Sequence, residues 1–233
     1  MRSTPRHART LRGPKAWPPR RATRKRAHRI ATAGRGVSGI TPGVRWHSAA
    51  MSEMPADPLE EFETARLHVR PAAADDLEDL LAVYTSNPAY LALTEGSHGE
   101  PGRYDRGMLE RDLTLAQMTP GRHMLSVASK DGGVIGVLDW MERNPSDGHP
   151  WIGLVMVHGE RQREGLGAEA VAGLLACLRR PGVAAVRAGV IERNPAGRAL
   201  MQRLGFAPVS ETTMRMAAAQ ERVLVFEHPL TGV

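Results

Sequence analysis

The stretch of the chain that tells most about it reads Val155-Met156-Val157-His158-Gly159-Glu160-Arg161-Gln162-Arg163-Glu164-Gly165-Leu166-Gly167-Ala168-Glu169-Ala170. An apolar segment of strand length passes through a loop with two late glycines into an apolar helical pattern. Glycine lets a backbone approach a ligand closely because it has no Cβ. The unpaired amides at a helix N-terminus bind phosphate oxygens. The stretch therefore predicts an anion site, to which Arg161 and Arg163 can add charge-assisted hydrogen bonds.

Two common nucleotide-binding patterns are missing from the sequence. It holds no G-x-x-x-x-G-K-(S/T), and no G-x-G-x-x-G follows the first expected strand. These patterns are typical of P-loop and dinucleotide-binding proteins. The predicted anion site is therefore of another kind.

The pattern around this stretch predicts an α/β or α+β fold. Apolar alternation and turn residues indicate strands at 67–71, 123–129, 134–141, 151–157, 185–191, 206–209 and 222–227. Helical spacing and end signals indicate helices at 73–86, 108–118, 168–180 and 195–204. Helices mixed among strands favour a mixed sheet covered by helices. The run 151–157 is expected to be buried on both faces.

Three motifs resemble one family. Gln162-Arg163-Glu164-Gly165-Leu166-Gly167 matches (Q/R)-x-x-G-x-(G/A), the acetyl-coenzyme A signature of the Gcn5-related N-acetyltransferase (GNAT) superfamily. Glu63-Thr64-Ala65-Arg66-Leu67-His68-Val69-Arg70-Pro71 resembles the T-x-R-L-x-L-R-P opening of the branch that includes ribosomal-protein N-terminal acetyltransferases. Asn194 to Phe206 resembles the N-x-x-(S/A)…L-x-x-x-L-G-F segment. The motifs stand in the family's order over roughly residues 60–227.

The resemblance implies a mixed, largely antiparallel central sheet that splays open at the cofactor site and is flanked by helices. The strand backbone at Val155, Met156 and Val157 would bind the pantetheine arm of acetyl-coenzyme A. The pyrophosphate would rest on the loop and the helix start, so the remaining cofactor-binding candidates are Gln162, Arg163, Glu164, Gly165, Leu166, Gly167, Ala168 and Asn194. Asn194 is also a preferred N-cap residue, and both roles are compatible.

The implied chemistry is direct transfer of an acetyl group from a thioester to a primary amine. The amine must lose a proton to attack, and a backbone amide, of Met156 or Val157, should stabilise the oxyanion. Many family members protonate the thiolate with a tyrosine on the last helix. That position is Met201 here, so a tyrosine acid is excluded there.

Four residues are candidates for the base. Asp139, Glu142, His158 and Glu192 follow or end strands near the expected opening. Each has a plain alternative as a solvated strand-end or loop residue. Asp139 stands out because strands disfavour aspartate.

Acceptor recognition is expected between residues 94 and 118 and near Trp140. Glu95, Glu100 and Asp105 could attract a cationic amine there, or they are ordinary surface acids. The acceptor is either a small molecule or a protein N-terminus. Cys177 fits a buried helical position better than an acyl carrier.

Charge is divided unevenly along the 233 residues, whose formal net charge is +6. Residues 1–50 hold 13 Lys and Arg and no acid, whereas residues 51–233 hold 18 Lys and Arg against 25 Asp and Glu, a balance of −7. We therefore expect a basic, disordered leader at 1–50 and one acetyltransferase domain at 60–230. The leader is a non-native extension before a start at Met51, a targeting peptide, or a ribosome- or nucleic-acid-binding arm.

Composition bounds the other partners. One cysteine allows no intrachain disulfide and no cysteine-rich zinc site, which favours a reducing cytoplasm. No apolar run approaches the roughly 20 residues of a membrane span. We expect no metal, no membrane partner, and no nucleic acid on residues 51–233. A homodimer is compatible with the resemblance. The rival function is an acyl-coenzyme A-binding module without catalysis.

Overall fold

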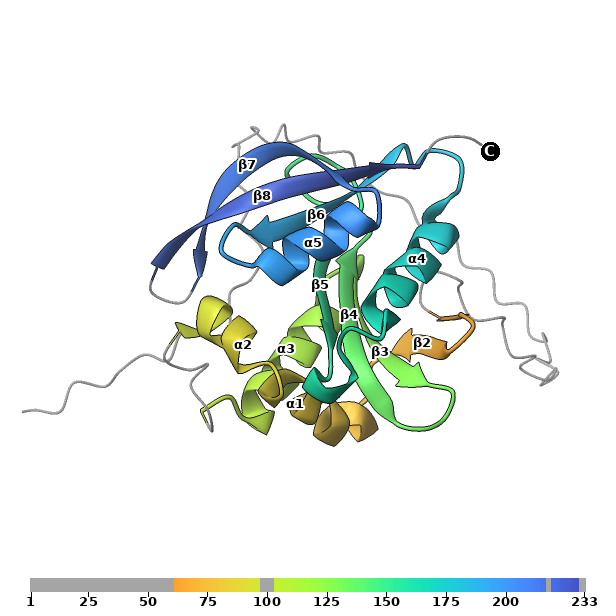
Figure 1. The fold of residues 1–233 in the computed structure, drawn as a ribbon, viewed down its shortest axis with the longest axis vertical. Coiled ribbons are helices and arrows are strands. Elements are labelled where there is room, and N and C mark those ends of the chain that lie inside the picture. The colour runs from red at the N-terminus through yellow and green to blue at the C-terminus, as the bar shows by residue number, and fades with distance from the viewer. Residues whose placement is uncertain (1–60, 97–102, 217–218, 231–233) are drawn as a thin grey trace, which may run out of the picture.

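The computed structural model describes residues 61–96, 103–216 and 219–230, which form an eight-stranded sheet with helices on both faces (Figure 1). The strands are β1 (Phe62–Glu63), β2 (Leu67–Pro71), β3 (Arg122–Ser129), β4 (Val134–Met141), β5 (Trp151–Val157), β6 (Ala185–Ile191), β7 (Ala207–Met216) and β8 (Ala219–Pro229). The helices are α1 (Leu77–Thr85), α2 (Pro88–Thr94), α3 (Arg106–Met118), α4 (Leu166–Leu178) and α5 (Pro195–Arg203), with 3-10 turns η1 (Ala74–Asp76) and η3 (Gly159–Arg161). The predicted leader, residues 1–50, lies outside the described residues.

The sheet order is β1-β2-β3-β4-β5-β6-β8-β7. Every neighbouring pair is antiparallel except β5 and β6, which are parallel. The prediction of a mixed, largely antiparallel sheet is confirmed.

Two parts of the chain differ from the predicted elements. Asn87-Pro88 ends α1 as expected, but Pro88 also begins α2, because proline at a first helical position has a suitable φ and needs no amide hydrogen bond. The last two strands are longer than the pattern indicated, since β7 and β8 pair with each other from Ala207↔Glu227 to Met216↔Ala219, whereas β6 follows β8 only from Pro229 to Val223.

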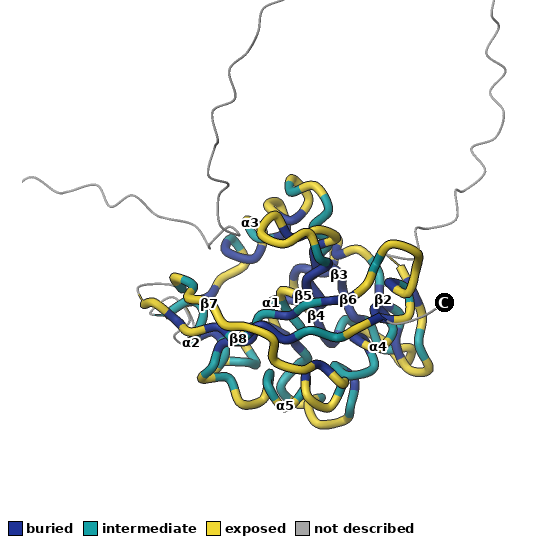
Figure 2. Tube along the Cα trace, turned by 90° about the horizontal axis from the view of Figure 1, so that it is seen from above, coloured by how far each residue is buried: buried dark blue, intermediate teal, exposed yellow. Residues whose placement is uncertain are grey.

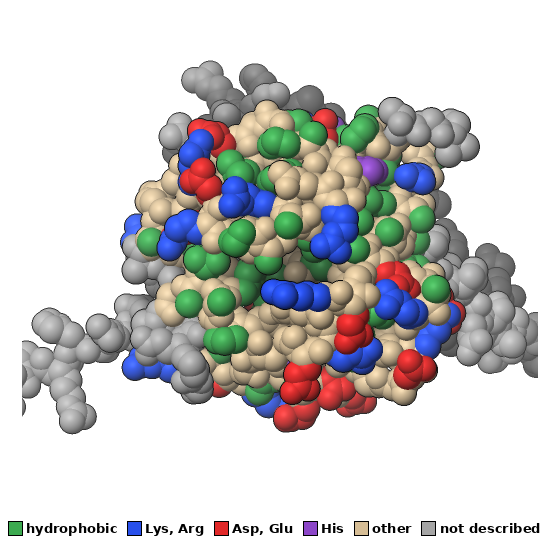
Figure 3. All heavy atoms as spheres, in the orientation of Figure 1, with side chains coloured by type: hydrophobic (Ala, Val, Ile, Leu, Met, Phe, Trp, Pro, Cys, Tyr) green, Lys and Arg blue, Asp and Glu red, His purple; other side chains and the backbone are tan. Residues whose placement is uncertain are grey.

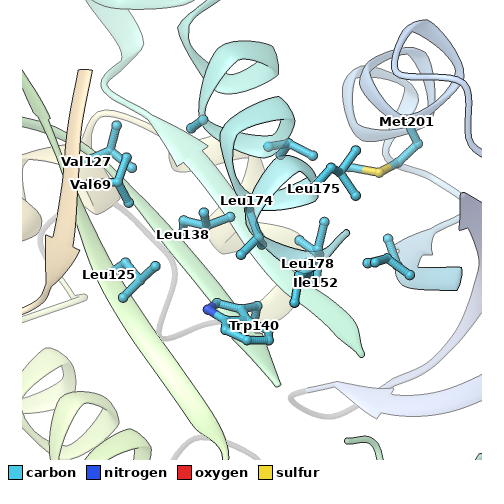
Figure 4. Close-up of a cluster of buried hydrophobic side chains, with 14 of the residues drawn as sticks. Val69, Leu125, Val127, Leu138, Trp140, Ile152, Leu174, Leu175, Leu178 and Met201 are labelled. Atoms are coloured by element: carbon cyan, nitrogen blue, oxygen red, sulfur yellow. The ribbon is translucent and has the colours of Figure 1, made fainter. Parts of the chain in front are cut away.

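Each face of the sheet has its own core. Leu67, Val69, Leu138 and Trp140 pack beneath α4 on one face (Figure 4). On the other face α1 and α3 cover a second cluster that includes Val137. Figure 2 shows the buried strands between α3 and α5. Trp140 is only 1% exposed, because its ring fills the core beneath α4. The expectation that acceptor recognition lies near Trp140 stays a prediction.

The sheet opens between β5 and β6. β5 follows β4 along its whole length, but pairs with β6 only at Trp151↔Arg187 and Ile152↔Ala188. Beyond this point the two strands diverge. Gly153 is the extra residue where the β4–β5 register shifts, and it is exposed although it lies in a central strand. The expectation that 151–157 is buried on both faces is therefore wrong at the opening.

The register fixes which backbone groups of β5 face this opening. His158 donates its amide to Ile135 O at 2.8 Å. Because hydrogen-bonded pairs alternate along an antiparallel ladder, Met156 and Leu154 also bond to β4. The amide and carbonyl groups of Val155 and Val157 then point away from β4, into the opening.

Candidate active site

The start of α4 is built as an anion cradle. Gly165 is its N-cap at φ 84°, in the left-handed region that favours glycine, and no side chain caps the helix. The first helical bond runs from Glu169 N to Gly165 O, at 3.0 Å. The amides of Leu166, Gly167 and Ala168 therefore have no partner within the helix and carry its positive dipole end.

The cradle lies against the open strand. A Cβ added at Gly167 would stand 3.5 Å from Val157 Cγ2 and 3.6 Å from Val155 Cγ1. The first turn of α4 thus packs on the side chains of the two residues whose backbone groups face the opening. The predicted strand and cradle are brought together as one site.

Arg163 has a strained backbone in the middle of the cradle. Its φ is 66°, the one positive φ of a non-glycine residue in the described part of the chain, and such a conformation costs of the order of 1–3 kcal/mol. Its side chain is exposed. Arg161, by contrast, pairs with Glu164, with its Nε 3.1 Å from Oε1. Figure 3 shows this face hollowed near its centre, with Lys and Arg side chains beside the hollow.

Arg66 ties the cradle to the start of β2. Its Nε donates to Glu169 Oε2 at 2.7 Å, and its Nη1 donates to Glu164 O at 3.1 Å. Thr64 Oγ1 donates to Glu169 Oε1 at 2.6 Å. Burial alone would raise the pKa of Glu169, but these hydrogen bonds outweigh it and hold the pKa below its usual range. The T-x-R segment Thr64-Ala65-Arg66 therefore supports the loop that precedes α4.

Asn87 links the helices of the other face to the same loop. Its Nδ2 donates to Val157 O at 3.0 Å, and its Oδ1 accepts from Gln162 Nε2 at 2.5 Å. Gln162 Nε2 also donates to Val157 O, at 3.2 Å. The neighbouring Ser86 Oγ accepts from Gly159 N at 2.9 Å. The end of β5 is thus held by the junction between α1 and α2.

The segment from Asn194 to Phe206 contains the predicted N-cap of α5. Asn194 caps α5, since its Oδ1 accepts from Gly197 N at 3.0 Å. Its Nδ2 makes no hydrogen bond within the described part of the chain and stays available for a ligand. Met201 is buried at 5% exposure, and in Figure 4 its side chain reaches toward Leu175. Met201 is therefore a core residue.

The base candidates occupy different places. Asp139 lies beside the bulge, because a Cβ on Gly153 would be 3.7 Å from its Oδ1. It is buried and ion-paired with Arg122, whose Nη2 lies 2.6 Å from Oδ2. Burial raises the pKa of Asp139, and the Arg122 guanidinium offsets part of the shift. His158 begins η3 at the other end of β5, about 16 Å from the bulge at 3.3 Å per residue.

The remaining acids of the set have partners elsewhere in the fold. Glu192 pairs with Arg222 Nη1 at 2.8 Å, and Glu142 lies 3.0 Å from His123 Nε2. Asp105 caps α3 by accepting from Met108 N at 2.9 Å. Glu100 lies outside the described residues. Asp139 is thus the acid of this set that the fold brings to the bulge.

Cys177 supports the core, as expected. It packs against the cluster beneath α4, and burial raises the pKa of its thiol. A raised pKa leaves little thiolate for nucleophilic attack.

Comparisons with known proteins agree with this geometry. A family model described as an acetyltransferase (GNAT) domain matches residues 66–207. The chain belongs to the GNAT acetyltransferase family. A comparison with curated proteins finds no match. No helix in the described part of this GNAT chain combines the length and apolar character of a membrane span. Within the same residues, no group of three or more His, Cys, Asp and Glu side chains could hold a metal.

Solved structures share the fold. An acetyltransferase from Thermus thermophilus is 23% identical, with coverage of 70% of this chain and 96% of that one and a TM-score of 0.58. The ribosomal-protein acetyltransferase RimL in complex with coenzyme A is 16% identical (73% and 98% covered, TM-score 0.58). A spermidine N-acetyltransferase from Vibrio cholerae in complex with coenzyme A and spermine is 15% identical (72% and 97% covered, TM-score 0.55).

Proposed function

We propose that this GNAT protein transfers an acetyl group from acetyl-coenzyme A to a primary amine by direct attack. The observation that carries the proposal is the uncapped start of α4 lying against the open edge of β5. One end of this arrangement offers unpaired amides to a pyrophosphate, and the other ends at an exposed bulge. Both the RimL and spermidine acetyltransferase structures contain coenzyme A.

The residues divide the binding work. Amides from Arg163 to Ala168 hold the pyrophosphate, with Gln162 and Glu164 shaping the loop around Gly165, Leu166 and Gly167. The backbone of Val155 and Val157 takes the strand-like pantetheine arm, since these groups face the opening. Met156 contributes its position in the strand, because its own amide is directed to β4. Asn194 adds a side-chain amide from the start of α5.

The transfer joins the acceptor nitrogen to the acetyl carbon and breaks the carbon–sulfur bond. A β5 amide on the open side stabilises the oxyanion. The acceptor ammonium gives up one proton to Asp139, directly or through a water. After the attack the nitrogen loses its second proton, which passes through water to the departing thiolate. Asp139 acts as the base because its carboxylate lies beside Gly153. His158 and Glu192 stand farther along the strands and serve in structure.

The test uses the full chain. Calorimetry should give a micromolar Kd for acetyl-coenzyme A, and thiol release should appear with amines from a panel of small molecules and peptide N-termini. Asp139→Asn should keep the Kd and lower kcat, with loss of the acidic limb of the pH–rate profile. No binding, or a Kd that Gly165→Asp leaves unchanged, would rule the proposal out.

A second candidate is an acyl-coenzyme A-binding module without turnover. It is favoured by Met201 in the tyrosine position and by the ion pair that occupies Asp139. Binding without thiol release on any amine would support it, and turnover with one amine defeats it. We assign either activity to the reducing cytoplasm.

A ribosome-binding role of residues 1–50 would appear as an affinity for ribosomes that depends on salt and is lost when these residues are deleted.

A further inference from the structure

The protein's three tyrosines lie in or against the core cluster on the α1 and α3 face of the sheet, the same face from which Asp139 adjoins the bulge. Tyr84 and Tyr104 stack with ring centroids 5.1 Å apart and planes at 3°. Tyr90 packs against the same core cluster. Burial raises the pKa of each of these phenols, and nearby carboxylates add to the shift. We name this group the tyrosine–acid cluster; its members are Tyr84, Tyr90, Glu95, Tyr104, Asp112 and Asp139.

The hydroxyls of Tyr84 and Tyr104 lack a protein hydrogen-bond partner in the described part of the chain. Tyr84 and Tyr104 are only 5% and 6% exposed, and neither hydroxyl has a hydrogen-bond partner among the described residues. The fully buried side-chain atoms without a partner in that part of the chain are Trp140 Nε1, Arg198 Nε and His228 Nδ1. The hydroxyls therefore keep contact with solvent. Both hydroxyls are therefore free to bond a ligand that replaces this water.

Asp112 is the acid in the cluster whose charge is unmatched. Arg122 is matched by Asp139 at 2.6 Å. Asp112 is half-buried on α3 and has no ion pair or hydrogen bond to a described residue. Burial raises its pKa to about 6; Arg122 opposes this, and Asp139 and Glu95 add to it. A half-buried, unpartnered carboxylate costs stability, which is typical of functional sites.

The cluster leads from the surface to the reacting end of the strand. Tyr90, Glu95 and Asp112 are partly exposed, whereas Asp139 is buried and adjoins Gly153. Leu154, next to the bulge, packs on the same core as Tyr90. A ligand held at Asp112 and extended past Asp139 would thus reach the opening of the sheet from the face opposite α4.

We infer that the tyrosine–acid cluster is the acceptor site and that it selects a primary amine carrying a second positive charge. The inference rests on the proposed acetyltransferase function. The reacting amine lies at Asp139 and the bulge. The second cation lies against Asp112 and the tyrosine faces, which attract cations electrostatically.

The test compares three acceptors that share one primary amine on a five-carbon chain. Cadaverine ends in a second ammonium, n-pentylamine in a methyl group, and 5-aminopentanoate in a carboxylate. With saturating acetyl-coenzyme A and the full chain, we expect kcat/KM to fall about tenfold or more from each to the next. The dipeptide amides Ser-Lys-NH2 and Ser-Gln-NH2 form a second pair, which tells a peptide source of the charge from a free diamine.

Asp112→Asn should reduce the cadaverine-to-pentylamine ratio about tenfold while keeping the Kd for acetyl-coenzyme A. The matched control is Glu110→Gln on the same helix; Glu110 faces solvent and pairs with Arg106 at 2.8 Å, so the ratio should not change. Equal kcat/KM for both members of each pair, with turnover intact, overturns the inference and leaves the proposed function standing. Absence of both acetyl-coenzyme A binding and turnover overturns the proposed function instead.

Discussion

The guanidinium of Arg66 lies 2.7 Å from the carboxylate of Glu169, across the gap between the start of β2 and the first turn of α4. Arg66 is half-exposed, so this ion pair alone contributes little to stability. Its geometry matters more, since the same guanidinium also holds Glu164 O at 3.1 Å. Arg66 thus fixes both sides of the Gly165 turn.

Loss of this support should weaken cofactor binding more than folding. We expect Arg66→Ala to raise the Kd for acetyl-coenzyme A about tenfold, or about 1.4 kcal/mol, with a shift in Tm of a few degrees at most. Calorimetry and thermal melts measure the two effects. Lys130→Ala is the control, because the Lys130 side chain makes an exposed ion pair with Glu63 at 2.9 Å and makes no bond to Glu164 or Glu169. An equal Kd for Arg66→Ala and Lys130→Ala would contradict the assignment.

A negative charge at the start of α4 should repel the pyrophosphate. Gly165→Asp is expected to raise the Kd for acetyl-coenzyme A about 100-fold, because it adds charge and a Cβ at φ 84°. Gly182→Asp is a matched control, since Gly182 has φ 89° and open space around its missing Cβ. Both variants carry the same backbone strain. Should Gly182→Asp lose affinity to the same degree, strain rather than charge would be the cause.

A side chain at Gly153 should leave the fold intact but lower kcat. A Cβ on Gly153 meets Asp139 O at 3.6 Å, which is ordinary contact. We therefore expect Gly153→Ala and Gly153→Val to fold. Gly153→Val should lower kcat at least 100-fold by filling the space beside Asp139, and the Kd for acetyl-coenzyme A should change only a few-fold. Stopped assays of thiol release check this, and wild-type turnover by Gly153→Val would place the reaction elsewhere.

Removing the charge of Asp112 should stabilise the protein at neutral pH. The folded-state pKa of about 6 exceeds the ordinary 3.8. A raised pKa means that the protonated group favours folding below pH about 4 and that this contribution is lost as pH rises through about 6. Asp112→Asn should thus gain about 1–3 kcal/mol at pH 8 and little at pH 4. The groups facing Asp112 are Arg111, Arg122, Asp139, Glu95, Tyr84, Tyr90 and Tyr104.

Urea titrations at both pH values measure this difference. A variant that gains stability at pH 8 while losing preference for a diamine shows that Asp112 is kept for recognition. Equal stability changes at pH 4 and pH 8 would show that ionisation of Asp112 is not the cause.

Local sequence patterns predict the elements around the start of α4. The strand before Gly165, the glycines and the helix after them are neighbours in sequence, so local sequence predicts the strand, the glycine turn and the helix start. The assignment of this turn to a cofactor rests on the resemblance to the GNAT motif. Strands 67–71, 134–141, 151–157 and 185–191 also have the predicted bounds. Their apolar alternation is set by burial in the sheet, which local sequence records.

The proposed acceptor site is formed by residues that are far apart in sequence, so no local pattern predicts it. Asn87 bonds to Val157 and Gln162 across a long stretch of chain, and the pKa of Asp112 on α3 is raised in part by the charge of Asp139 on β4. Asp112 sits in an ordinary amphipathic helix, so only its unpartnered, half-buried position distinguishes it. The motif around Arg66 was visible, but its partner Glu169 becomes evident only when β2 and α4 lie side by side.

The Asn87 bridge has a consequence for redesign. Because Asn87 and Gln162 share the carbonyl of Val157, a change of backbone at the α1–α2 junction is transmitted to the donor loop. Residues farther along, such as Tyr90 and Asp112, are not tied to that carbonyl. New acceptor preferences can therefore be engineered by varying α2 and α3 while Ser86 and Asn87 are kept, so that one half of the enzyme diversifies and the other stays constant.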